Sequence, residues 1–493
     1  MKRILFLAGI VILGTAWVLG GFYVHQLWLD SHPGAGFISS TPPPAPPPPP
    51  PTLQPLPDID ALAARMKKNQ DIYQKVRDEA LAAYAAKNPA SQPYDEEAKA
   101  TLRLAAYLSV WDDYYGEGLW PQLGVHTDHL PQEGCTDPIW EILSNLKQDR
   151  DSHSNSEQDA LEVNQQMLAI DGTPYPALFK YEAYESAILN LVAAKTSDIH
   201  LQKSLDAIPD LTARATTQYQ ELIKAGYPND ILFQKGRNFL KDVQDDEPTL
   251  QAVSESLGHA FDATAKDSVV APVLEADFYV EDAWAARGSG YSNTVTDEGW
   301  RLFRERLAHA NDILTDLYTK YPNEGMIPDV MMTVVLGQQQ PRDQMELWFS
   351  RGIQADPDNF HLYMAKRWYL YPRWYGSDDD LWKFGTECAQ SNNWSAKIPM
   401  IFIESIADTA DRNPDFFASP DVWTPVEKVY RDYLNYYPAS VHYRSLFAKS
   451  AVQGKHWDVA KEQFKILGDD WDRDVFEGDD YTTMTRLTNA NAK

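Results

Sequence analysis

The sequence predicts an all-α protein in which an array of helix pairs follows an N-terminal membrane span and a proline-rich linker. Three observations predict this fold class. An uncharged apolar run and a proline tract occupy the first 57 residues. Helical periodicity then recurs in one segment after another, and continuous β-type alternation of useful length is hard to find. In the second half, prolines end amphipathic runs at recurring intervals.

The apolar run covers residues 4–24 and follows Lys2 and Arg3. These 21 residues, at about 1.5 Å of helical rise each, match the ~30 Å hydrocarbon core of a bilayer. Cations before the run, with Asp30 after it, predict a cytoplasmic N-terminus. We therefore expect residues 1–25 to form a single-pass inner-membrane anchor, with the body of the protein in the periplasm.

A cleaved secretory signal peptide is the alternative. Signal peptides usually have an apolar region of about 7 to 15 residues that ends at a small-x-small cleavage site. The run here is longer, and Gly20 to Val24 offers no clean site of that kind. The sequence therefore favours a retained anchor, and both interpretations export the body.

Residues 26–57 are predicted to be a linker. The stretch from Ser31 to Pro57 holds 12 of the 33 prolines, including the unbroken run Pro46 to Pro51. Such a composition favours the extended polyproline II helix, at about 3.1 Å per residue. We expect a spacer that holds the body away from the bilayer. A docking site for a proline-reading module is the alternative.

Charge and cysteine content restrict the partners further. The 44 basic and 71 acidic residues give a formal net charge of −27. Nucleic-acid phosphates repel a chain this acidic, so we expect no nucleic-acid partner. Cys135 and Cys388 lie 253 residues apart, and we expect two unpaired buried thiols more than a disulfide.

The body divides in this prediction into a helical region at 58–270 and a second helical domain at 271–493. Ile59 to Lys87 is rich in Ala and Leu and contains neither Gly nor Pro, which favours a helix. Further helices are predicted over Tyr94–Tyr115, Pro174–Ala194, Leu211–Ala225 and Asn229–Val243. The sharpest amphipathic pattern runs from Glu298 to Tyr318. Its stripe should face the core and consists of Trp300, Phe303, Leu307, Ala310, Leu314 and Leu317.

The second domain resembles tetratricopeptide repeats. Pro322 and Pro357 lie 35 residues apart, close to the 34-residue period of that repeat. The phrase GIQADPDN, from Gly352 to Asn359, resembles the end of a second repeat helix and the turn after it. Near the C-terminus, the sequence resembles the turn and second helix of such a repeat at Gly454, Trp457, Ala460 and Phe464.

A narrower resemblance covers roughly Asp277 to Phe476. The segment Asp356–Ser377 reads DPDNFHLYMAKRWYLYPRWYGS. It resembles a bacterial family of unknown function in which a DPDN turn leads through a helix to a PRWxGS motif. Tyr375 stands where many members have glycine. The resemblance implies a helical, repeat-like domain and brings no established activity.

The PRWxGS-like segment holds the predicted binding residues, Arg373, Trp374 and Ser377. Pro372 and Gly376 favour a tight turn that would present the indole face and a guanidinium fork suited to carboxylates. An acidic or sugar ligand would fit such a group. The alternative is an internal clasp, with Trp374 in the core and Arg373 paired with an aspartate such as Asp378 or Asp379.

Other candidate sites have weaker support in the sequence. Four residues of types that bind zinc lie in or next to a predicted loop: His126, Asp128, His129 and Cys135. A polar surface loop explains these residues as well. We therefore expect neither a metal nor another cofactor. Two carboxylate doublets stand beside aromatic residues, as in sugar-cleaving enzymes, and consist of Asp112 with Asp113 and Glu281 with Asp282. Adjacent carboxylates on a helix point about 100° apart, so neither doublet is itself a catalytic pair.

These observations favour a binding protein over an enzyme. Stacked helix pairs form extended surfaces that suit polypeptide ligands and need no catalytic residues. We expect a scaffold that binds a protein or peptide partner in the bacterial envelope. The alternative is an all-α envelope enzyme that acts on polysaccharide or peptidoglycan.

Overall fold

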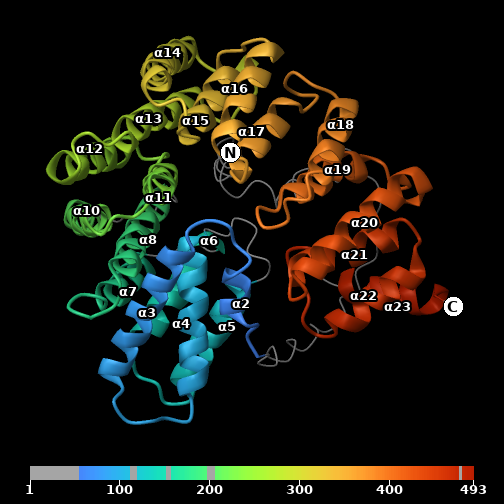
Figure 1. The fold of residues 1–493 in the computed structure, drawn as a ribbon, viewed down its shortest axis with the longest axis horizontal. Coiled ribbons are helices and arrows are strands. Elements are labelled where there is room, and N and C mark those ends of the chain that lie inside the picture. Colours follow the sequence, from blue (N-terminus) through green and yellow to red (C-terminus); the bar gives the residue numbers. More distant parts are fainter. Residues whose placement is uncertain (1–54, 112–118, 152–156, 197–205, 477–479, 493) are drawn as a thin grey trace, which may run out of the picture. The chain divides into compact units, whose positions relative to one another are not determined.

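The computed structural model describes residues 55–111, 119–151, 157–196, 206–476 and 480–492. Within these ranges all regular elements are helices and no strand occurs, which confirms the predicted all-α class (Figure 1). No helix in these ranges is both long enough and apolar enough to span a bilayer. The predicted anchor at 4–24 and nearly all of the predicted linker lie outside the described residues.

The helices form two compact units. The larger unit comprises Leu56–Ala407 and Pro425–Ser440, and the smaller one includes Asp408–Thr424 and the chain from Val441 onward. The division falls within two helices, α19 (Ile401–Arg412) and α20 (Pro420–Tyr436).

The other helices of the larger unit are α2 (Ile59–Ala63), α3 (Gln70–Lys87), α4 (Asp95–Val110), α5 (Leu119–Gln132), α6 (Ile139–Asp151), α7 (Glu157–Leu168), α8 (Ala177–Thr196), α10 (Ile208–Lys224), α11 (Asn229–Asp242), α12 (Glu247–Thr264), α13 (Val270–Arg287), η1 (Ser292–Thr294), α14 (Asp297–Lys320), α15 (Met326–Gly337), α16 (Arg342–Ala355), α17 (Phe360–Tyr369), α18 (Asp378–Ala389) and η2 (Ile398–Met400). The remaining helices of the smaller unit are η3 (Phe416–Ala418), α21 (Val441–Gln453), α22 (Trp457–Leu467) and α23 (Asp480–Asn491).

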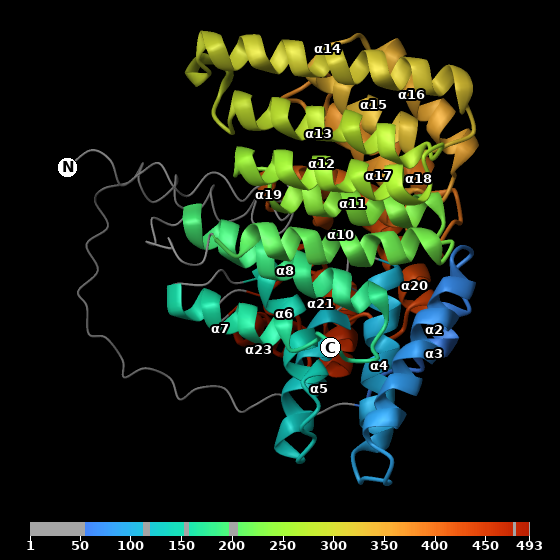
Figure 2. The same cartoon turned by 90° about the vertical axis from the view of Figure 1, so that its left-hand side faces the viewer.

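Helix packing in the larger unit is local in sequence. Each helix packs chiefly against helices one or two places along the chain. Figure 2 shows α8, α10, α12, α13 and α14 one above another in that order. Packing of this kind is typical of stacked repeats, in which each element buries its apolar face against its neighbours. The predicted array of helices is confirmed at this level.

Helix α14 shows how sequence produces one layer of the stack. The Thr296 hydroxyl accepts a hydrogen bond from Gly299 N at 3.0 Å and caps the first turn. Five of the six predicted stripe residues are buried, from Phe303 to Leu317, whereas Trp300 is only partly buried. The helix ends at Lys320, two residues before Pro322, as the sequence predicts.

The smaller unit contains the predicted turn between α21 and α22. A Cβ atom at Gly454 would lie 2.6 Å from the Phe417 carbonyl oxygen, so glycine permits this close approach. His456 stacks on Trp423, with ring centroids 4.0 Å apart, and its Nε2 lies 2.7 Å from the same carbonyl oxygen. Ala460 and Phe464 are buried on α22.

A second close approach places the turn from Asp356 to Asn359, here called the acidic turn, against the preceding layer of the larger unit. A Cβ atom at Gly325 would lie 2.8 Å from the Asp356 Cβ. Inside the turn, Asp358 N donates to Asp356 Oδ1 at 3.1 Å, and the Asn359 side chain caps α17 by accepting from His361 N. Both aspartates keep carboxylate oxygens for other partners.

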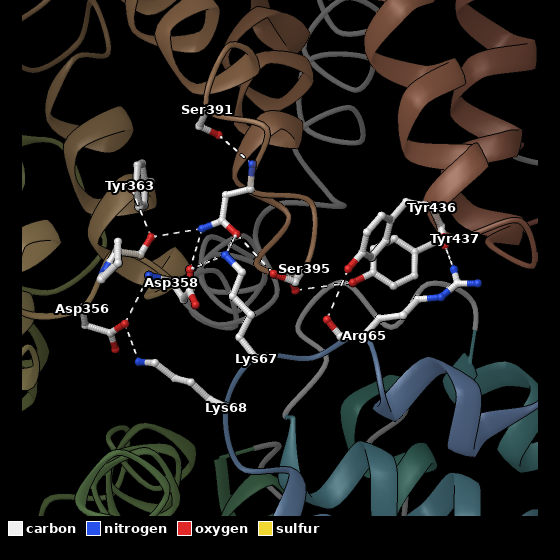
Figure 3. Close-up of polar contacts among 12 residues, drawn as sticks. Arg65, Lys67, Lys68, Asp356, Asp358, Tyr363, Ser391, Ser395, Tyr436 and Tyr437 are labelled. Carbon is white, nitrogen blue, oxygen red and sulfur yellow. Dashed lines mark hydrogen bonds and ion pairs between the residues drawn. The ribbon is translucent and has the colours of Figure 1, made fainter.

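Those partners come from the loop between α2 and α3, residues Arg65–Lys68, here called the basic loop (Figure 3). Lys67 Nζ lies 3.5 Å from Asp358 Oδ1 and donates to Asn393 Oδ1 at 2.9 Å, while Lys68 pairs with Asp356. The Lys67 contacts join residues 291 and 326 positions apart, in contrast to the local packing elsewhere in the unit.

The basic loop also contacts the end of α20 (Figure 3). The Arg65 guanidinium donates to the Tyr436 carbonyl and lies over the Tyr436 ring, 5.5 Å from its centroid. The Tyr436 hydroxyl donates back to the Arg65 carbonyl at 3.2 Å, and the Tyr437 hydroxyl lies 3.9 Å from Met66 Sδ. After the loop, Asn69 adopts a left-handed backbone with φ 60° and donates to Asp230.

We predict that the double substitution Lys67→Glu and Lys68→Glu loosens this contact without unfolding the stack. Repulsion would replace two half-exposed ion pairs, each worth up to about 1 kcal/mol. Hydrogen–deuterium exchange should become about fivefold faster in residues 59–73 and 356–369 and stay unchanged in α8 and α10. Lys320→Glu on α14 is the control, and 1 M salt should shrink the difference. Equal protection of the variant and the wild type would contradict the prediction.

Candidate binding surface

The PRWxGS-like segment forms a tight turn directly after α17. Trp374 N donates to the Tyr371 carbonyl at 2.9 Å, and Tyr375 N donates to the Tyr369 carbonyl at 3.2 Å. A Cβ atom at Gly376 would lie 2.1 Å from the Leu370 carbonyl oxygen, so only glycine fits there. Tyr375 is not among the residues with positive φ, and its ring stacks on Tyr369 at 4.7 Å. The turn therefore does not need glycine at position 375.

Arg373 is exposed and stacks on an aromatic ring. Its Cζ atom lies 4.1 Å from the Trp368 ring centroid and 5.2 Å from that of Tyr371. Among the described residues it forms no ion pair, so the expected alternative of a clasp with Asp378 or Asp379 does not form. The N–H edge of this guanidinium remains available to a ligand.

Ser377 has a structural partner. Its hydroxyl accepts from Asp380 N at 3.1 Å and donates to Asp380 Oδ2 at 2.8 Å, which caps α18. Asp380 in turn pairs with Arg342 at 2.5 Å. The structure thus gives Ser377 a capping role, whereas Arg373 is exposed and Trp374 beside it is partly exposed with its Nε1 atom buried.

Trp374 belongs to a cluster that the sequence did not predict. Its ring lies 6.3 Å from Trp284 at the end of α13 and 6.4 Å from Trp368 on α17. Arg287 lies over both Trp284 and Trp300, at 5.6 and 5.4 Å from the ring centroids. All four tryptophans are partly exposed. The Trp–Arg surface, as named here, comprises Trp284, Arg287, Trp300, Trp368, Arg373 and Trp374.

Sequence reasoning missed half of this surface for a definable reason. Trp284 and Arg287 are three residues apart on α13, a spacing that places both on one helix face. Nothing local indicates that this face meets the turn after α17, because the intervening segment is more than 80 residues long. The periodicity of α14 predicts Trp300 as part of the core stripe, but this residue is only partly buried and Arg287 lies over its ring.

The zinc-type residues are engaged by other side chains. Residues 119–132 form α5, so the predicted loop is a helix with Pro131 inside it. His126 Nδ1 lies 2.8 Å from Glu97, which His129 also contacts, whereas Asp128 accepts from Ser144 and Cys135 Sγ accepts from Trp140 Nε1. No set of three or more His, Cys, Asp or Glu side chains in the described chain is arranged to hold a metal ion. Both cysteines are buried and unpaired, as predicted.

Of the two carboxylate doublets, one can be located. Asp112 and Asp113 lie outside the described residues. Glu281 and Asp282 are buried on α13, and Asp282 pairs with Arg306 at 2.6 Å. Buried in this way, neither carboxylate reaches a polymeric substrate.

Glu281 instead adjoins a buried charge cluster behind the acidic turn. The Asn359 side chain donates to Asp329, whose other oxygen accepts from Arg237 at 3.0 Å. Arg237 Nε lies 3.5 Å from Asp277, which is fully buried and forms no hydrogen bond with the described residues. Polar contacts thus connect the acidic turn to buried charged residues on α15, α11 and α13.

Burial and charge set the protonation of this cluster. Burial raises the pKa of Asp277, and Arg237 only partly offsets that effect. For Asp329, burial raises the pKa, but Arg237, His361 and Asn359 together outweigh it, so the pKa lies below the ordinary value. Burial raises the pKa of Glu281 to about 7, with Lys241 and Arg237 opposing the shift and Asp277 adding to it. Near neutral pH, Glu281 is therefore partly protonated.

We predict that Glu281→Gln changes how stability depends on pH. A carboxyl group whose pKa is higher in the folded than in the unfolded state stabilises the fold below its unfolded pKa and loses that contribution as pH rises. Wild-type protein should therefore lose roughly 3 to 6 °C of melting temperature relative to the variant between pH 5 and pH 8. Thermal unfolding across this range measures the difference. Parallel curves would contradict a proton bound at Glu281.

Comparisons of the chain with protein-family models, curated proteins and solved structures find no match. The resemblance to the family with the PRWxGS motif therefore stays a prediction, and the surface has to be interpreted from its own chemistry.

Proposed function

We propose that this chain is a membrane-tethered, extracytoplasmic scaffold that binds a protein or peptide partner in the bacterial envelope. The Trp–Arg surface carries this proposal. Trp and Arg are the side chains most enriched where binding energy concentrates in protein interfaces. Four partly exposed tryptophans within one connected cluster are costly to keep in water unless a ligand covers them.

The helical array supports the proposal. Stacked helices hold side chains from α13, α14, α17 and the following turn in fixed relation, as recognition by a rigid surface requires. The tether is supported by the apolar run at 4–24 and by the proline-rich linker.

An envelope enzyme is the weaker alternative. Its acid and base would be two carboxylates about 5 to 10 Å apart in an accessible cleft. Glu281 and Asp282 are buried, and the acids near the Trp–Arg surface, such as Glu298 and Asp380, already pair with arginines. No observation in the described residues favours a catalytic pair there.

The proposed location predicts the behaviour of C-terminal reporter fusions. A phosphatase that folds only outside the cytoplasm should be active on the full chain, and a fluorescent protein that folds only inside should stay dark. Deleting residues 4–24 should reverse both readouts. Fluorescence from the full-length fusion would refute the tethered, exported arrangement.

The proposed partner predicts a site-specific covalent adduct. A photo-crosslinkable phenylalanine analogue at Tyr375, which is 36% exposed beside the surface, should capture a polypeptide in living cells. The same analogue at Tyr321, which is 39% exposed at the end of α14, is the matched control. The Tyr375 adduct should be destroyed by protease and resist glycosidase. A glycosidase-sensitive adduct, or equal capture at both positions, would contradict the proposal.

A further inference from the structure

Two arginines on the Trp–Arg surface pair with no carboxylate of the described residues, although the chain holds 71 acidic residues. Within the part of the chain that the structure describes, the Arg373 side chain contacts the rings of Trp368 and Tyr371 and forms no ion pair. Arg287 donates through Nη1 to the carbonyls of Gly288 and Gly290, and no described carboxylate lies within ion-pair distance of it. Both cations therefore retain N–H groups that can bind an anion.

Three acids near the surface already have arginine partners. Asp282 pairs with Arg306, Glu298 with Arg301, and Asp380 with Arg342. Asp378 and Asp379 follow Arg373 in the sequence, but neither lies within ion-pair distance of it. Salt screens the more distant negative charge of the chain over about 8 Å. Arg287 and Arg373 therefore remain cations of this surface with which no described carboxylate pairs.

The ring contacts distinguish between ligand classes. Sugars stack on bare aromatic faces, but here Arg373 covers Trp368, and Arg287 covers Trp284 and Trp300. Trp284 and Trp374 meet edge to face, at 85°. The surface thus offers guanidinium groups held on rings, flanked by indole edges. This combination suits a carboxylate within an apolar segment better than a sugar ring.

Ring contacts limit the distance between the two cations. The contacts that link Arg287 to Arg373 pass through Trp284, Trp374 and Trp368 in steps of 4.1 to 6.4 Å. At about 3.3 Å per residue, an extended peptide of roughly seven residues is as long as this whole path, so it is long enough to reach both cations.

We propose that the Trp–Arg surface binds an extended acidic segment of a partner polypeptide, an inference that rests on the proposed function. Arg373 and Arg287 would each hold one carboxylate, Arg373 through two parallel N–H bonds. The apolar residues between the carboxylates would lie against Trp284 and Trp374.

Fluorescence anisotropy tests this with the full chain in detergent at 0.15 M salt. The probe is a labelled seven-residue peptide with glutamate at both ends and leucine, alanine and proline between them. Its control has glutamine at both ends. Arg373→Gln and Arg287→Gln should each raise the Kd of the acidic peptide about tenfold or more, since hydrogen bonds to charged groups contribute that much. Arg373→Lys should also weaken binding, because lysine lacks the bidentate fork.

Arg351→Gln is the matched control. Arg351 stacks between Tyr318 and Trp348, with both centroids 4.4 Å away, but it is a single arginine outside the surface. Its substitution should leave the Kd unchanged, and all variants should keep the wild-type melting temperature. Equal binding of the glutamine peptide, unchanged Kd in both Arg variants, or an equal loss in Arg351→Gln would overturn the inference.

Two further outcomes separate this inference from the proposed function. If a carboxylated oligosaccharide such as trigalacturonate binds with the same arginine dependence and the peptide does not, the ligand is a glycan and the inference fails. If Arg373→Gln leaves the polypeptide adduct at position 375 unchanged, the scaffold function stands and the carboxylate recognition is wrong. Loss of that adduct in Arg373→Gln but not in Arg351→Gln supports both.

Discussion

The acidic turn Asp356–Asn359 is the constraint on which the larger unit depends. Its two aspartates contact the basic loop between α2 and α3, and its asparagine contacts the buried cluster of Asp329 and Arg237. Partly exposed ion pairs are individually weak, whereas an unpaired buried charge is costly. The turn is therefore held firmly on its inner side and loosely on its outer side.

The same turn positions the Trp–Arg surface. Asn359 caps α17, and α17 carries Trp368 to the tight turn where Leu370 and Gly376 meet without room for a Cβ atom. This backbone contact fixes the positions of Arg373 and Trp374 relative to Trp284 on α13. Recognition at the surface thus depends on the acidic turn at the other end of α17. The stability of that turn and ligand binding at the surface are therefore linked through α17.

Sequence patterns predicted the helices well because helix periodicity, capping and proline breaks are local signals. The stripe of α14 and the α21–α22 turn follow from such signals, whereas the two unpaired thiols follow from the wide separation of Cys135 and Cys388 in the sequence. At the candidate site the sequence indicated Arg373 and Trp374, but it did not indicate Trp284 and Arg287 as their neighbours. Contacts between segments 80 to 370 residues apart, such as Trp284 with Trp374 or Arg65 with Tyr436, leave no local pattern in one sequence. Nor could the sequence show that Glu281 is buried, because acidic doublets look the same on either face of a helix.

The short helix α2 has a mechanical consequence. Asp60 ties it to Tyr73 and Arg77 of α3, and the basic loop follows only two residues after its end at Ala63. Any tension on the chain ahead of Leu56 would enter the fold at α2, where it would load first the contacts of Asp60 with α3 and then the lysine–aspartate contacts of the basic loop. These ion pairs are partly exposed and individually weak, so α2 and the basic loop would yield before the helices that follow them.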